Sequence, residues 1–118
     1  MTQKMMFKEK VVSYFGYWPK FCDGKICSFL FDEYEEKVHL DIDYIDTDKS
    51  KRALVKIVFS HVSSLNLDNF RNQNILDELI INEDLKDRLR IDLISCYGLS
   101  GSFECGGIEV KDIVLHPI

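Results

Sequence analysis

The stretch VHLDIDY at residues 38–44 decides the fold, because apolar and polar side chains alternate through it without a break. A period of two is typical of a β-strand that has one face in a core and the other in water. By this alternation Asp41 and Asp43 lie on the outward face together with His39. The stretch therefore predicts a strand at the surface of a layered domain.

Two neighbouring runs predict strands on either side of this one. Residues 25–32 (KICSFLFD) carry little polarity on either face, so we expect this strand to be covered on both sides. Residues 53–62 place three apolar side chains on one face, namely Val55, Ile57 and Phe59. Short polar segments at 33–36 and 46–51 join the three runs, and this arrangement favours an antiparallel meander.

The amino-terminal segment has the pattern of an amphipathic helix. Phe7, Val11 and Phe15 follow one another at spacings of four, which places them on one helical face. Gly16 can take the left-handed conformation that ends a helix, and Pro19 follows three residues later. We therefore expect a helix that ends at Phe15.

The middle of the chain leaves alternatives open. Residues 63–74 are rich in Ser, Asn and Asp, and they fit either a packed loop or a short helix that begins at Asp68. Their apolar residues are the expected anchors: Leu65, Leu67 and Phe70. Residues 78–83 fit a strand or a helical turn, whereas residues 89–96 alternate like a strand with Leu89, Ile91 and Leu93 inward.

The last segment predicts a closing hairpin. Residues 103–105 and 108–115 read as strands, and Gly106 and Gly107 between them can both take the positive φ of a two-residue turn. The fold class that follows is α+β: an amino-terminal helix followed by a mainly antiparallel β-sheet or sandwich.

The length and the net charge of the chain limit the classes of function that it can have. The chain has 118 residues, which suits a single domain at 1–118, and 15 basic against 20 acidic residues give a net charge of −5. A nucleic-acid partner is not expected, since phosphate binding needs concentrated Lys and Arg. No run reaches the roughly 20 apolar residues of a membrane span, and no secretory leader is visible, so we expect a cytoplasmic protein without a membrane partner.

Four cysteines are present: Cys22, Cys27, Cys96 and Cys105. In the cytoplasm they are expected to be reduced, and their spacings match neither a zinc ribbon nor a CxxC redox motif. We therefore predict no metal and no cofactor, and we expect small, buried apolar side chains. Cys22 is the exception, because it follows a Trp-Pro turn and is expected to be partly exposed.

No specific catalytic constellation is present. His39, His61 and His116 are scattered along the chain, Ser100 lies in a glycine turn whose spacing differs from a nucleophile elbow, and no phosphate-binding loop with Lys occurs. The sequence therefore favours a protein that is not an enzyme.

Acidic residues concentrate in one hairpin. Residues 32–48 hold eight carboxylates against Lys37 alone, a net charge of −7. Four of them are the candidate partner-binding residues: Glu35, Glu36, Asp41 and Asp43. Such a surface can steer a basic protein, although an ordinary solvated face gives the same pattern, and a nearby basic run (Lys49, Lys51, Arg52 and Lys56) partly neutralises it.

The run FGYWPKFCD at residues 15–23 resembles the opening "FG-x-WP-x-F-H-D" of the family called immunity protein 50, from bacterial polymorphic toxin systems. The run YGLSGSFEC at residues 97–105 is similar to the aromatic-rich glycine turn at the end of that family. The resemblance covers most of the chain. Cys22 departs from it, because the family usually has His at this position.

The resemblance implies a small cytoplasmic protein that binds and neutralises a cognate toxin without catalysis or cofactor. We predict that it acts by occlusion; if the toxin is a nuclease, the acidic residues would act as phosphate mimics in its basic groove. Five residues of the opening are expected to be structural: Phe15, Trp18, Pro19, Phe21 and Asp23. The alternative is a small ligand-binding or enzymatic domain with a pocket near Cys22 and Asp23.

Overall fold

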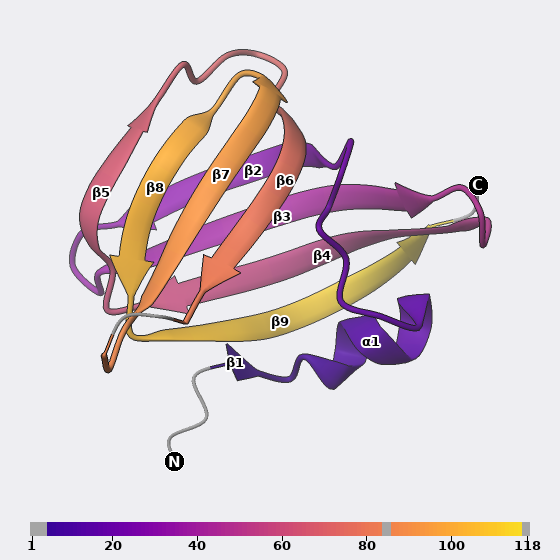
Figure 1. Cartoon of the computed structure of the whole chain (residues 1–118), viewed down its shortest axis with the longest axis horizontal. Helices are drawn as coiled ribbons and strands as arrows, with labels where there is room; N and C mark the ends of the chain where they lie inside the picture. Colours follow the sequence, from indigo (N-terminus) through magenta and orange to yellow (C-terminus); the bar gives the residue numbers. More distant parts are fainter. Residues whose placement is uncertain (1–4, 84–85, 117–118) are drawn as a thin grey trace.

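The structure, a computed structural model, describes residues 5–83 and 86–116 and consists mostly of β-strands with one short helix in that part of the chain (Figure 1). The elements in chain order are β1 (Met5–Met6), α1 (Glu9–Phe15), β2 (Lys25–Asp32), β3 (Lys37–Asp46), β4 (Lys51–Ser60), β5 (Ser63–Asp68), β6 (Ile75–Asn82), β7 (Leu89–Tyr97), β8 (Ser100–Cys105) and β9 (Gly107–His116). No helix in the described residues has the length and apolar character needed to cross a bilayer.

The strands join in the order β1-β9-β4-β3-β2-β6-β7-β8-β5. Seven of the eight neighbouring pairs are antiparallel, but β1 pairs with β9 in parallel, so the sheet is mixed. Lys25 and Ile75 form the only register pair between β2 and β6 in the described residues, and Figure 1 shows β6, β7 and β8 crossing over β3 and β4. The strands thus form two groups, β1-β9-β4-β3-β2 and β6-β7-β8-β5, and the core lies between them. There the rings of Phe59 and Phe103 meet edge to face, with their centroids 5.1 Å apart.

The central prediction is confirmed. Alternate residues of β3 are buried, namely Val38, Leu40, Ile42 and Tyr44, and β3 pairs antiparallel with both β2 and β4. Val55, Ile57 and Phe59 of β4 are buried on the same inner face, as predicted. Period-two patterns of this length specify register strongly, because a slip by one residue would move every apolar side chain into water.

The expectation that β2 is covered on both faces is wrong. Only Ile26 of this strand is buried, whereas Leu30 is 56% exposed and Phe31 is 39% exposed. In the described residues β2 pairs with β6 only at Lys25, so the second half of β2 lies at the rim of the core, where neither face is fully covered.

The amino-terminal helix is shorter than its periodicity predicts. It begins at Glu9, and Phe7 lies before it at φ 62° and partly exposed, because the preceding residues pair with β9 as β1 instead of continuing the helix. Val11 and Phe15 are buried as predicted. Gly16 ends the helix at φ 90°, and its N–H donates to the carbonyl of Val12, which confirms the predicted left-handed cap.

The predicted hairpin at Gly106 and Gly107 is wrong. β8 pairs with β7 and β5, whereas β9 pairs with β4 and β1, so the chain passes at this point from one strand group to the other. Neither glycine has a positive φ. The N–H of Gly106 donates to the carbonyl of Ser60, and this bond fixes the crossing beside the β4–β5 connection.

In the middle of the chain neither alternative holds for residues 63–68, whereas the strand alternative holds for residues 78–82. Residues 63–68 form the outer strand β5 and not a packed loop or a helix from Asp68; of the expected anchors, Leu67 packs against the core, but Leu65 and Phe70 are exposed. The run at 78–83 belongs to strand β6 up to Asn82. Leu89, Ile91 and Leu93 of β7 are buried, as the alternation predicted.

Candidate functional site

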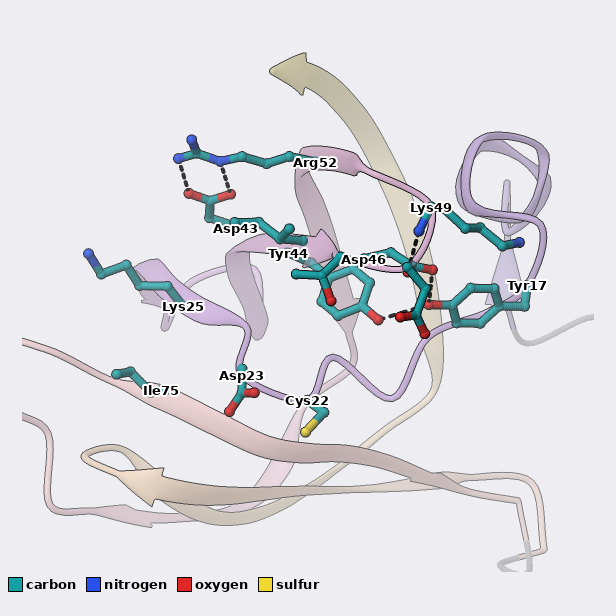
Figure 2. A pocket seen from close by; sticks show the side chains of 13 residues that line it. Tyr17, Cys22, Asp23, Lys25, Asp43, Tyr44, Asp46, Lys49, Arg52 and Ile75 are labelled. Atoms are coloured by element: carbon teal, nitrogen blue, oxygen red, sulfur yellow. Dashed lines mark hydrogen bonds and ion pairs between the residues drawn. The ribbon is translucent and has the colours of Figure 1, made fainter. Parts of the chain in front are cut away.

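An open depression of about 870 Å³ lies between the segment that follows α1, the β3–β4 turn and the start of β6 (Figure 2). Its described lining combines three cationic side chains with four carboxylates: Lys25, Lys49 and Arg52, with Asp23, Asp43, Asp46 and Asp48. Tyr17, Cys22 and Tyr44 also line it. The depression therefore carries charges of both signs on a partly apolar lining.

A hydrogen-bonded chain of two tyrosines and an aspartate forms one wall. The hydroxyl of Tyr17 donates to Oδ2 of Asp46 at 2.7 Å and lies 2.8 Å from the hydroxyl of Tyr44. Since the single proton of Tyr17 goes to the carboxylate, Tyr44 donates to Tyr17. Asp46 is only 9% exposed, and its second oxygen accepts the N–H of Lys49 at 3.1 Å. This buried carboxylate is thus satisfied from both sides.

The same contacts move two pKa values apart. The hydrogen bond from Tyr17 is the largest cause that lowers the pKa of Asp46, and the backbone N–H of Lys49 adds to it. The pKa of Tyr17 is raised far above its usual range, first by desolvation and then by its hydrogen bonds to Tyr44 and Asp46. At neutral pH the pair therefore consists of a carboxylate and a neutral phenol.

Two lysines of the β3–β4 region fix the helix beside this wall. Nζ of Lys49 donates to the carbonyl of Phe15 at 2.7 Å, and Nζ of Lys51 donates to the carbonyl of Tyr14 at 2.7 Å. Cations at the carboxyl end of a helix satisfy its free carbonyls and complement its dipole. The wall is thus a structural joint between α1 and the β3–β4 turn.

We expect Asp46→Asn to weaken the fold in a pH-dependent way. A carboxyl with a lowered folded-state pKa stabilises the fold fully above its unfolded-state pKa, about 3.9, and loses this effect as pH falls through the folded value. In urea unfolding, the variant should be less stable than the wild type at pH 7, and the difference should shrink below about pH 4. Asp48→Asn, exposed in the same turn, is the matched control; an Asp46→Asn loss that does not change with pH would contradict this assignment.

Cys22 and Asp23 face the depression from the segment between α1 and β2 (Figure 2). Cys22 is exposed, as expected, but the Asp23 carboxylate and then desolvation raise its pKa, so the thiol form prevails at neutral pH. No histidine is among the described residues that line the depression. This geometry offers a place for a ligand but no activated thiolate.

The expectation that the other cysteines are buried is mostly wrong. Cys27 and Cys96 are exposed, and only Cys105 is buried. Cys27 lies on the incompletely covered strand β2, and Cys96 lies near the end of β7, where burial of alternate residues ceases. Within residues 5–83 and 86–116, no group of three or more Asp, Glu, His or Cys side chains is placed to hold a metal ion.

Asp41 and Asp43 share the outward face of β3, and both are paired. Arg52 donates two hydrogen bonds to Asp43, at 2.7 and 3.0 Å, and Nζ of Lys56 lies 3.4 Å from Asp41. The Arg52 guanidinium holds the pKa of Asp43 below its usual range. The basic run of β4 therefore neutralises this half of the acidic hairpin, as its sequence suggested.

Glu35 and Glu36 lie in the β2–β3 turn, whereas Asp43 lies at the opposite end of β3 in the wall of the depression. Both glutamates are exposed, and neither forms a salt bridge with another described residue. The structure thus divides the four candidate residues into an unpaired turn and a paired strand face.

The aromatic residues of the 15–23 run lie in and against the core. Phe15 and Phe21 are fully buried, Pro19 is buried, and Trp18 is half-buried with its ring 5.6 Å from that of Phe21. Asp23 is exposed at φ 64°, and its N–H donates to the carbonyl of Leu76. These residues carry the chain from the helix to β2.

The sequence did not predict the hydrogen-bonded wall of the depression, which is formed by Tyr17, Tyr44, Asp46 and Lys49. Tyr44 and Asp46 stand two apart on one strand, so alternation places both on the inner face of β3, and this was the available signal. Nothing in the local pattern indicates that Tyr17, 27 residues before Tyr44, meets them.

Comparison with protein families gives the class: an immunity protein. The sequence model of the family Immunity protein 50 matches residues 8–116, so the chain belongs to this family. No curated protein and no solved structure shows a significant match to the chain.

Proposed function

We propose that this protein binds a cognate toxin of its own cell and neutralises it by occlusion, without making or breaking a covalent bond. Membership of the immunity protein 50 family, over residues 8–116, is the observation that supports the proposal. The protein would act in the cytoplasm by covering the active site of the toxin, or a surface that the toxin needs.

The unpaired acidic turn is the part of the candidate surface best suited to a basic partner. The electrostatic field of an exposed carboxylate is not cancelled when no cation is paired with it. Such a carboxylate can therefore speed the association with a positively charged protein. Asp41 and Asp43 already hold Lys56 and Arg52, and a toxin would have to displace these cations to use them. Glu35 and Glu36 are therefore better candidates for contact with the toxin than Asp41 and Asp43.

The test is direct. The toxin domain encoded beside this gene is purified, its activity is titrated with the protein, and the complex is measured by surface plasmon resonance. A stoichiometric loss of toxin activity together with co-elution supports the proposal. Absence of binding and inhibition at micromolar concentrations would refute it.

Charge reversal separates the two halves of the acidic hairpin. We expect Glu35→Lys combined with Glu36→Lys to lower the association rate constant by roughly tenfold and to reduce its salt dependence. Asp41→Lys combined with Asp43→Lys, which makes the same change of total charge on the paired strand face, is the comparison and should lower the rate less. Equal association rates for the wild type and the Glu35→Lys/Glu36→Lys variant would remove the turn from the interface.

The second candidate is a ligand-binding domain that uses the depression beside Cys22 and Asp23. The open volume of about 870 Å³, with polar groups on a partly apolar lining, favours it. The raised pKa of Cys22 counts against the enzymatic form of this alternative, because a thiol nucleophile needs a lowered pKa or an adjacent base. We therefore place the binding of a toxin first.

A further inference from the structure

The second half of β2 has an open sheet edge on the side away from β3. β2 pairs with β3 through Asp32, but its pairing with β6 on the other side is confined to Lys25. Within the described residues, no strand other than β3 pairs with residues 28–32. We refer to residues 28–32, on the side away from β3, as the β2 edge.

Apolar side chains surround this edge on both faces. Phe29 packs partly against the core, Leu30 is 56% exposed on the outer face, and Phe31 is 39% exposed on the inner face. A crevice of about 170 Å³ separates the beginning of the edge from the loop after β5, and the exposed ring of Phe70 lines it. Unpaired backbone groups beside apolar side chains are the features that an added strand uses, for hydrogen bonds and for side-chain contacts respectively.

The charge at the far end of the edge, in the β2–β3 turn, is negative, whereas Arg71 lines the crevice at its beginning. Asp32 and the turn residues Glu33, Glu35 and Glu36 stand at its end, and none of the four forms a salt bridge with another described residue. The side chain of Asp32 accepts the N–H groups of Tyr34 and Glu35, so this turn is locally ordered. A basic strand would meet complementary charge here, whereas an acidic strand would be repelled.

We propose that the β2 edge receives an extended, basic segment of the toxin, which adds to the sheet as a strand beside β2. This inference rests on the proposed function and specifies how the partner binds. Main-chain hydrogen bonds to residues 28–32 would supply affinity, and Leu30 and Phe31 would contact alternate side chains of the added strand. The acidic turn would select Lys and Arg at the end of that strand beside residues 32–36.

The same turn argues against two other occupants. Nucleic acid would be repelled by four neighbouring carboxylates. Charged residues beside an open edge commonly prevent pairing between two copies of one chain. A basic protein segment is the occupant that the charge favours.

The test compares two leucines of nearly equal exposure. Leu30 on β2 is 56% exposed and Leu115 on β9 is 58% exposed, so lysine at either position should leave the fold intact. We expect Leu30→Lys to weaken binding of the toxin domain by roughly tenfold or more, because a lysine there opposes both a basic partner and an added strand, and we expect Leu115→Lys to bind like the wild type. Hydrogen exchange of the full-length protein should show residues 27–32 becoming protected in the complex.

The outcomes are distinguishable. Failure of the wild-type protein to bind the toxin would refute the proposed function itself. Tight binding by the wild type with unchanged affinity of Leu30→Lys, or without protection of residues 27–32, would overturn the strand-addition inference alone. Dimerisation of the free protein that Leu30→Lys abolishes, seen in sedimentation velocity, would also overturn it by assigning the edge to a second copy.

Discussion

Phe21→Ala is expected to lower the free energy of unfolding by about 3–5 kcal/mol, the range for removing a fully buried phenylalanine ring. The side chain of Phe21 is 0% exposed, and its ring meets those of Trp18 and Tyr44 edge to face at centroid distances of 5.6 and 5.5 Å. Tyr44 in turn belongs to the hydrogen-bonded wall of the depression. Loss of the ring would therefore leave a cavity and loosen the joint between the 15–23 segment and β3.

The backbone makes Phe21→Ala easy to interpret. Phe21 has φ 63°, a left-handed conformation that alanine and phenylalanine both adopt at a cost, so the substitution changes the ring and not the backbone strain. Urea unfolding measures the effect. Phe70→Ala removes the same ring from a side chain that is 65% exposed, and it should change stability by less than about 1 kcal/mol. Equal losses for the two variants would show that the Phe21 ring is not a core anchor.

Gly101→Ala is the second large effect, with an expected loss of about 2–5 kcal/mol from backbone strain and overpacking together. Gly101 has φ 139°, where side chains are disfavoured, and an added Cβ would collide with the carbonyl oxygen of Asn66 and lie 2.9 Å from Cα of Leu67. Both obstacles are backbone atoms of β5, so β5 would have to move away from β8. Stability is measured by urea unfolding, and amide exchange in residues 63–68 should accelerate.

Gly106→Ala is the control for Gly101→Ala. Gly106 has no positive φ, and the atom nearest to an added Cβ is Cβ of His61 at 3.2 Å, which would have to move by only a few tenths of an ångström. We expect a smaller loss there, below about 1.5 kcal/mol. A Gly101→Ala protein as stable as Gly106→Ala would mean that β5 is not held against β8 at this point.

The strands whose signals are local could be predicted from the sequence. β3 and β7 alternate over at least five residues, and the burial of their inward side chains follows that alternation. The glycine cap at Gly16 was also predictable, because ending a helix depends on the conformational freedom of one residue. The family membership was indicated by two short runs and confirmed by a match over residues 8–116.

The candidate site was predictable only in part. Alternation correctly placed Asp41 and Asp43 on one outward face, but it could not decide which carboxylates keep a free charge. Arg52 and Lys56 neutralise these two because β4 pairs beside β3 in a particular register, and this register results from burial on the opposite face. The pocket expected beside Cys22 and Asp23 is present, whereas its tyrosine and aspartate wall depends on contacts between segments about 30 residues apart.

The sequence by itself determined the strands β2, β3, β4 and β7, the side of β3 and β4 that faces the core, and the residue at which α1 ends, since each of these depends on side-chain periodicity or on one residue's φ. Only the tertiary structure decided that β8 and β9 separate at Gly106, that β1 replaces the first helical turn, and that half of β2 pairs with β3 alone among the described strands. These features depend on which strands pair across long sequence separations. Such pairing is set by the total apolar area that the two strand groups bury against each other, which no local pattern contains.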